Sequence, residues 1–159
     1  MDERRVRSLL MGVELYRDRD LAVRELYQNA LDACRYRRAR TEYLDRTSSL
    51  ASYTYDGRIE FRQGVDENGR AYLECQDNGV GMGEEELRGV FSNAGARFAE
   101  QLDVKLERAE WRKVDPPVEL YPNSRFGIGV LSYFMLADEI RVNTCRLDAS
   151  SHSLMRKGF

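Results

Sequence analysis

The stretch RELYQNALDACRYRR, residues 24–38, places an acid, an amide and a second acid on one face of an expected helix. These residues are Glu25, Asn29 and Asp32, separated by steps of four and three residues. Side chains at that spacing lie one turn apart on the same helical face, so the three polar groups point the same way. The stripe indicates either a solvated helix face or a binding site, and the stretch alone favours the solvated face.

The composition indicates one folded domain without a strong overall charge. The chain has 159 residues, of which 42% are apolar and 10% aromatic, enough to bury a core. Its 25 basic and 27 acidic residues give a formal charge of -2, so nucleic acid is not an expected partner. No stretch approaches the roughly 20 apolar residues of a membrane span, and the first residues lack the apolar run of a signal peptide. We therefore expect no membrane partner and a cytoplasmic location.

The cysteines and the single histidine exclude several classes of site. Cys34, Cys75 and Cys145 are far apart and lie in apolar or strand-like surroundings, which predicts buried thiols in a reducing compartment. No CxxC pair exists, so a structural zinc site is not expected. His152 lies in a polar tail, which argues against Ser-His-Asp and Cys-His catalysis.

A basic cluster within residues 35–40 has two interpretations. It consists of Arg35, Arg37, Arg38 and Arg40. Such residues could bind a phosphate, or they could solvate the end of a helix, where cations suit the helix dipole. The helix-end interpretation is favoured.

Hydrophobic periodicity and turn residues divide the chain into short helices and strands. The expected helices are residues 6–16, 21–43, 84–91, a stretch between 98 and 109, and the apolar run after Gly129. The expected strands are residues 58–62, 71–76 and 139–145, and residues 45–57 are expected to form a loop. Asp20 is a candidate N-cap, Asn68-Gly69 predicts a hairpin, and Trp111 is expected to anchor its segment.

Two glycine loops follow the polar-faced helix in the chain. Residues 77–82, DNGVGM, come directly after an expected strand, and residues 126–129, FGIG, open an expected helix. Each loop alone is a weak signal, because short glycine motifs often form only turns. Ligands bind at strand ends and helix starts, so the order of the three segments is the stronger observation.

The residues of the first loop have the chemistry to bind a nucleobase. Asp77 is a carboxylate that accepts hydrogen bonds, which suits the exocyclic amine of adenine. Gly81 allows its backbone to approach a flat base, and Met82 offers a polarizable apolar contact.

The second loop and the first helix have the chemistry to bind phosphate and its metal. Gly127 and Gly129 leave backbone N–H groups at a helix N-terminus, where Arg125 adds positive charge. Asn29 supplies a neutral oxygen for magnesium, and Glu25 could orient or deprotonate the water that attacks the terminal phosphate. Together these segments predict a site for ATP or ADP with Mg²⁺.

The segments ELYQNALDA, DNGVGM and FGIGVLSYFMLAD resemble the three nucleotide-binding boxes of the gyrase, heat-shock-90, histidine kinase and MutL ATPase superfamily. Within it the chain is most similar to the heat-shock-90 chaperones, because FGxG is followed by an aromatic-rich helix and Ala-Asp. The resemblance covers about residues 9–144.

The resemblance implies an α+β fold, a two-layer α/β sandwich of the Bergerat type with a mixed, mainly antiparallel sheet and helices on one face. Residues 1–159 would form a single ATP-binding domain containing a lid-like segment, residues 92–125. Glu25 would activate water, Asn29 would bind magnesium, and Asp77 would read adenine. The other implied nucleotide contacts are Asp32, Ala33, Gly81, Met82, Arg125, Gly127, Ile128 and Gly129.

Some features of the family are not found in the sequence. The strands with a Gly-Thr that follow the third box are not evident before Phe159, which predicts a fragment or an abbreviated variant. The lid-like segment matches poorly, and the family's later domains, one of which supplies a catalytic arginine, are absent. The expected partners are therefore further domains of a longer chain, partner proteins or a second copy, and ATP hydrolysis could need the missing domains.

Three other functions use the same motifs differently. A MutL-like or microrchidia-like protein would use ATP to clamp a dimer on DNA, which the near-neutral charge does not favour. A partner-binding module with relic boxes would not need the intact Glu25, Asn29 and Asp77. A histidine kinase would not need a water-activating acid at Glu25. The favoured prediction is an ATP-hydrolysing conformational switch of the heat-shock-90 type.

Overall fold

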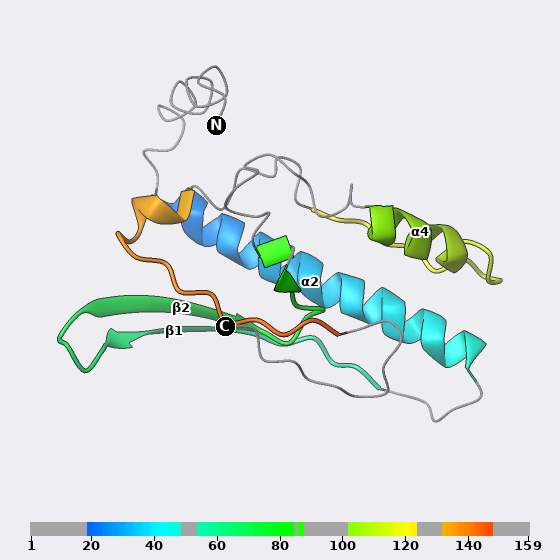
Figure 1. The fold of residues 1–159 in the computed structure, drawn as a ribbon, viewed down its shortest axis with the longest axis horizontal. Coiled ribbons are helices and arrows are strands. Elements are labelled where there is room, and N and C mark those ends of the chain that lie inside the picture. The colour runs from blue at the N-terminus through cyan, green and yellow to red at the C-terminus, as the bar shows by residue number, and fades with distance from the viewer. Residues whose placement is uncertain (1–18, 49–53, 85, 88–101, 124–131, 148–159) are drawn as a thin grey trace, which may run out of the picture.

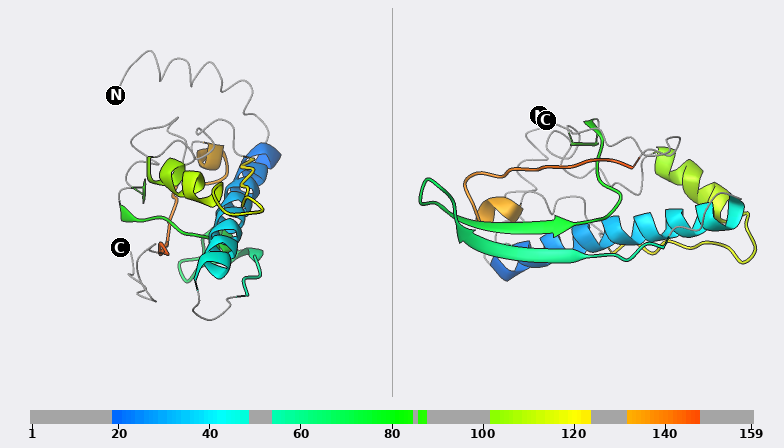
Figure 2. Two further views of the ribbon diagram at one scale, coloured as in Figure 1. Left: turned by 90° about the vertical axis from the view of Figure 1, so that its right-hand side faces the viewer. Right: turned by 90° about the horizontal axis from the view of Figure 1, so that it is seen from below.

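A long helix, α2 (Arg19–Thr47), is the central element of the structure. The structure is a computed structural model that describes residues 19–48, 54–84, 86–87, 102–123 and 132–147. A hairpin lies along the N-terminal half of α2, and a second helix, α4 (Leu102–Trp111), lies near its C-terminal end (Figures 1 and 2). One 3-10 turn, η3 (Tyr133–Met135), lies beside the start of α2 (Figure 1). The predicted α+β class is confirmed.

Helix α2 is longer than the periodicity predicts. It begins at Arg19, so Asp20 lies inside its first turn and the N-cap prediction is wrong. It continues to Thr47, because Arg46 pairs with Glu42 one turn earlier and the Thr47 hydroxyl donates to the Tyr43 carbonyl at 2.8 Å. The loop predicted from residue 45 therefore starts only after Thr47.

The predicted hairpin is confirmed, with longer strands than expected. Strand β1 (Ile59–Val65) pairs antiparallel with β2 (Ala71–Asp77), and Phe61 lies opposite Cys75. The turn is closed by a 2.9 Å bond from the Gly69 N–H to the Asp66 carbonyl, with Gly69 at φ 78°. Only glycine adopts that backbone conformation without strain, which explains the Asn-Gly signal.

The core lies between the C-terminal half of α2, helix α4 and the segment of residues 118–120. Trp111 is 1% exposed, and its ring lies 5.1 Å from that of Tyr36 at an interplanar angle of 54°. The other buried core residues are Ala39, Val80, Val104, Val118 and Leu120. The prediction that Trp111 anchors its segment is confirmed.

The strand predicted at residues 139–145 is wrong. These residues adopt no strand, and their neighbourhood is bonded to a loop instead: the Leu147 N–H donates to the Val80 carbonyl at 3.0 Å. Alternating side chains suit an extended segment, but a strand also needs a neighbouring ladder. The apolar helix predicted after Gly129 is described only from Ser132 onward. There the helical residues are Ser132 and those of η3.

Several predicted elements lie outside the described residues. Residues 6–16 belong to this group, and of the helix predicted at 84–91 only residues 84, 86 and 87 are described, as helical. The helix predicted between 98 and 109 is found at Leu102–Trp111. Within the described part of the chain, no helix is long and apolar enough to cross a bilayer.

The three cysteines are free thiols. Cys34 is buried, as predicted, whereas Cys75 and Cys145 are half-buried. Burial raises the pKa of Cys75 to about 11, and the nearby Asp77 charge adds to the shift. The Cys75 thiol is therefore protonated at neutral pH.

Trp111→Ala should lower the free energy of unfolding by about 3–5 kcal/mol, because it removes the largest fully buried side chain and leaves a cavity. Urea denaturation followed by circular dichroism measures the loss. Tyr121→Ala is the control, since Tyr121 is 72% exposed and its truncation should cost less than about 0.5 kcal/mol. Equal losses in the two variants would contradict the assignment of Trp111 as the core anchor.

Candidate functional site

The polar stripe of α2 lies on a half-buried face, not on a solvated one. Glu25, Asn29 and Asp32 are all of intermediate exposure. The Asn29 Nδ2–H donates to the Tyr133 hydroxyl at 2.6 Å. The Asp32 carboxylate accepts the Asn123 N–H at 2.8 and 3.0 Å. The solvated face, which the stretch taken alone favoured, is therefore not found, because other segments of the chain contact the stripe.

Tyr133 links the first and third predicted boxes, and the sequence prediction missed it. Burial raises the pKa of Tyr133 to about 12, the Asn29 hydrogen bond opposes that shift, and the Glu25 charge adds to it. The phenol therefore remains protonated at neutral pH, close to both α2 side chains. Its place within LSYFMLAD was the only signal in the sequence.

The end of β2 lies directly against α2. The Val80 N–H donates to the Ala33 carbonyl at 3.1 Å. A Cβ atom on Gly79 would lie 2.5 Å from the Ala33 carbonyl carbon and 2.6 Å from its Cβ, so only glycine fits there. The sequence prediction assigned Gly79 no role of its own, whereas the structure requires a glycine there for packing.

Asp77 is partly desolvated at this junction. Its Oδ1 accepts the Gly79 N–H at 2.8 Å, and its side chain still reaches solvent. Surrounding protein atoms nevertheless raise the pKa of Asp77, and the Gly79 N–H partly offsets that effect. A desolvated carboxylate forms stronger hydrogen bonds than one in bulk water.

Gly81 and Met82 contact the segment that contains Thr144 and Cys145. Gly81 has φ 70°, and a Cβ there would lie 2.0 Å from the Cys145 carbonyl oxygen. The Met82 N–H donates to the Thr144 Oγ1 at 2.8 Å. The backbone group that approaches Gly81 in this structure is thus Cys145, on the side where a Cβ would project.

Asn78 is a structural residue that the sequence interpretation also missed. Its Oδ1 accepts the Arg58 N–H at 2.7 Å and the Tyr55 hydroxyl at 3.0 Å. Its Nδ2–H donates to the Asp56 carbonyl at 2.8 Å. Asn78 therefore fixes the start of the glycine loop to the segment before β1, which a DNG motif alone does not reveal.

The basic cluster lies in the middle of α2, so the helix-end interpretation is wrong. Arg35 donates to the Tyr121 carbonyl at 3.3 Å, and Arg37 donates to the Asn78 carbonyl at 2.7 Å. Arg40 is 7% exposed and pairs with a carboxylate of α4. These three arginines tie other segments to the helix, while Arg38 is exposed.

The remaining predicted site residues lie outside the described part of the chain and stay predictions. They are Arg125, Gly127, Ile128 and Gly129. His152 lies there as well. Among the described residues, no three His, Cys, Asp or Glu side chains gather to hold a metal ion.

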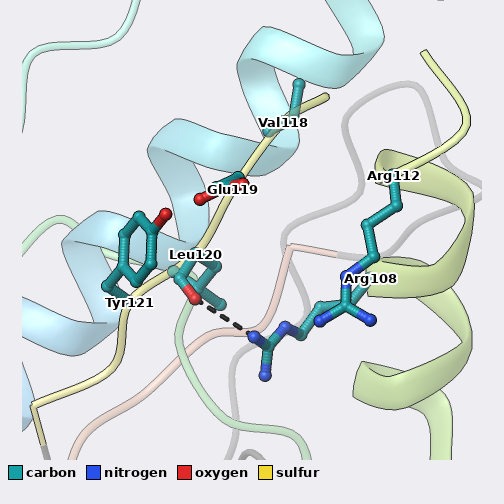
Figure 3. Close-up of a pocket in the computed structure, with 6 residues that line it drawn as sticks. All are labelled: Arg108, Arg112, Val118, Glu119, Leu120 and Tyr121. Carbon is teal, nitrogen blue, oxygen red and sulfur yellow. Dashed lines mark hydrogen bonds between the residues drawn. The ribbon is translucent and has the colours of Figure 1, made fainter. Parts of the chain in front are cut away.

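A hollow of about 310 Å³ opens between α4 and residues 118–121, and it contains none of the predicted site residues (Figure 3). Arg108 of α4 and Arg112, which directly follows α4, extend into it (Figure 3). The Arg108 Nη2–H donates to the Leu120 carbonyl at 3.1 Å.

We assign the candidate site to the junction of α2, β2 and η3, because residues of all three predicted boxes meet there.

Gly81→Ala should destabilise the protein by at least about 2 kcal/mol more than Gly69→Ala. Both substitutions strain a positive φ, at a cost of about 1–2 kcal/mol each. Gly69 has nothing within 4 Å of the added Cβ, whereas at Gly81 that Cβ meets the Cys145 backbone. Urea denaturation of both variants measures the difference. Equal destabilisation would show that Gly81 is not tightly packed in solution.

Comparison with known proteins finds relatives among chaperones. Chaperone protein HtpG of Nitrobacter hamburgensis is 33% identical over 144 residues, which cover 88% of this chain and 21% of that protein. HtpG of Rhodospirillum rubrum is 36% identical over 136 residues, 83% of this chain and 20% of that protein. HtpG of Psychrobacter cryohalolentis is 34% identical over 139 residues, 85% of this chain and 18% of that protein.

These relatives bear on one of the functional alternatives. No protein-family model and no solved structure matches the chain. The chain spans about a fifth of the length of the curated relatives it matches. The MutL-like or microrchidia-like alternative is not favoured by these relatives. Over most of its length this chain is similar to part of the HtpG chaperones, which belong to the heat-shock-90 family.

Proposed function

We propose that this chain is an ATP-binding, ATP-hydrolysing switch domain of a heat-shock-90-like chaperone. The observation that carries the proposal is the meeting of three distant segments at α2. Ala33 of the first box accepts the Val80 N–H of the second, and Asn29 bonds Tyr133 of the third. Segments that together form a ligand site must converge in this way. The similarity to HtpG chaperones supports the same function.

Adenine would bind at the end of β2. Asp77 is an acceptor with one oxygen already oriented by the Gly79 N–H at 2.8 Å. Its partial desolvation suits a hydrogen bond from the exocyclic amine of the base. Ala33 and Met82 would supply apolar contacts, and Asp32 would hold residue 123 in place through its backbone N–H.

Magnesium would bind through the Asn29 side chain and the nucleotide phosphates. The Asn29 Nδ2–H donates to the Tyr133 hydroxyl at 2.6 Å, so the amide Oδ1 would be the atom that binds the cation. Magnesium is usually held by one or two protein ligands with water and phosphate oxygens, so a single neutral oxygen fits its chemistry. Bound magnesium would supply charge neutralisation at the phosphates.

Glu25 lies one helical turn before Asn29 and would activate the attacking water. Its carboxylate is close enough to Tyr133 to contribute to the raised pKa of that phenol. Arg125 and residues 127–129 would hold the phosphates at the start of the following helix. Hydrolysis would convert ATP and water to ADP and phosphate, and domains outside this chain could contribute to its rate.

The full fold would be a two-layer α/β sandwich of the Bergerat type, completed by further strands beside β1 and β2. The lid-like segment 92–125 would change position with the bound nucleotide, and α4 belongs to it. The greater length of the HtpG relatives supports further domains as partners. We propose a cytoplasmic location and a second copy of the chain as a further partner.

Asp77→Asn should weaken ADP binding by about tenfold or more, because the amide replaces a charged acceptor. Isothermal titration with ADP and magnesium chloride measures the affinity. Glu74→Gln on the solvent-exposed part of β2 is the matched control and should bind as the wild type does. Absence of binding heat with the wild type, or equal affinity in Asp77→Asn, would contradict the proposed site.

Asp77→Asn should not destabilise the fold at neutral pH. A raised carboxyl pKa means that the folded protein holds this proton more tightly than the unfolded chain. Wild-type stability therefore falls as pH rises from the ordinary Asp pKa of about 3.9 to the raised value. Asp77→Asn lacks this loss. Urea denaturation of both proteins between about pH 3 and pH 7 measures the difference in the free energy of unfolding. Loss of binding without loss of stability separates a ligand contact from a folding defect.

Glu25→Gln should lower the rate of ATP hydrolysis by about 10²–10⁴-fold and leave ADP affinity unchanged. The substitution keeps the shape of the side chain and removes its basic carboxylate. Phosphate release and isothermal titration measure the two quantities. Glu42→Gln on the exposed part of α2 is the matched control. Unchanged hydrolysis in Glu25→Gln would reject this residue as the water-activating base.

A further inference from the structure

One carboxylate of α4 receives two side chains of α2. Glu107 accepts a hydrogen bond from the Tyr36 hydroxyl and pairs with the Arg40 Nε at 3.1 Å. Tyr36 and Arg40 lie one turn apart on α2 and are 4% and 7% exposed. Burial raises the pKa of Tyr36, and the Glu107 hydrogen bond adds to the shift, so the phenol remains a donor. We call these three residues the Glu107 cluster.

Arg40 also contacts the segment that holds the glycine loop. Its Nη1–H donates to the Leu147 carbonyl. The Leu147 N–H donates in turn to the Val80 carbonyl at 3.0 Å, and Thr144 holds the Met82 N–H. A single buried guanidinium therefore connects α4 with the chain that supports residues 80–82.

The same supporting segment is tied to the loop a second time. Arg146 pairs with Glu86, which is 8% exposed. The other Glu86 oxygen accepts the Gly83 N–H at 2.9 Å. Three separate bonds therefore tie residues 144–147 to the loop, through Leu147, Thr144 and Arg146.

We propose that the Glu107 cluster holds α4 on α2 and couples the position of α4 to the glycine loop through Arg40. A buried arginine needs its acceptors, because an unpaired buried charge is strongly unfavourable. Displacing α4 removes the carboxylate from Arg40, and the guanidinium must then find new partners or release Leu147. The loop and α4 are thus linked sites, and linkage between two sites acts in both directions.

The consequence for nucleotide rests on the proposed function. If the loop binds adenine, the Glu107 cluster sets how much of that binding energy is used to position α4. Glu107 is then a positioning residue that acts through Arg40 and touches no nucleotide.

Hydrogen exchange of the whole chain without nucleotide tests the coupling. Glu107→Gln should accelerate exchange in peptides from α4 and in peptides covering residues 80–83 by about tenfold or more. Tyr36→Phe keeps the aromatic contact with Trp111 and should accelerate α4 alone, because Arg40 and Glu107 remain paired. Glu110→Gln, also on α4, is the control, since Glu110 pairs with Lys113 three residues later and should change neither region.

The hydrogen-exchange results decide the proposal, and no nucleotide is needed for them. Unchanged α4 exchange in Glu107→Gln would overturn the holding role, and faster α4 exchange with an unchanged loop would overturn the coupling. Equal acceleration in the β1 and β2 peptides would indicate general destabilisation and would also overturn it. A change of about tenfold in ADP affinity in Glu107→Gln, the same factor as expected for hydrogen exchange, would extend the coupling to the ligand. If wild-type protein binds no ADP, the proposed function fails while the exchange result still stands.

Discussion

The hydrogen bond from the Val80 N–H to the Ala33 carbonyl is the contact on which the arrangement of this protein depends. It brings the end of β2 onto the middle of α2, where the Ala33 carbonyl lies within the helix. That approach is open only to a residue without a side chain at position 79. A small local requirement therefore sets the distance between the sheet and the helix, and with it the position of Asp77 beside Ala33.

Polar contacts do much of the remaining work of holding segments to α2. Arginines are usually exposed to solvent, but several on α2 donate to carbonyl groups of distant loops, as Arg37 does to Asn78. Arg40 is buried because it serves two segments at once. Buried charges of this kind add specificity when all their partners are present, since each missing partner is costly. The same dependence makes them suitable for relaying movement.

Much of the local structure could be predicted from residue patterns. The hairpin follows from Asn68-Gly69 and alternating side chains, and Trp111 is buried as its surroundings predict. The strand predicted at residues 139–145 does not form, because a strand needs a neighbouring ladder, and none for this segment is found among the described residues. Tyr133 was missed for a related reason: its partner, Asn29, lies 104 residues earlier.

The sequence by itself determined the local elements and the chemical identity of the candidate site residues, because periodicity, turn residues and side-chain functional groups are local properties. Glu25, Asn29 and Asp77 are predicted on those grounds alone. Only the tertiary structure decided that the stripe on α2 is covered, that Asn78 and Tyr133 organise its surroundings, and that Arg40 connects α4 with the glycine loop. These facts depend on which distant segments share a surface, and that is settled by the packing of the whole chain.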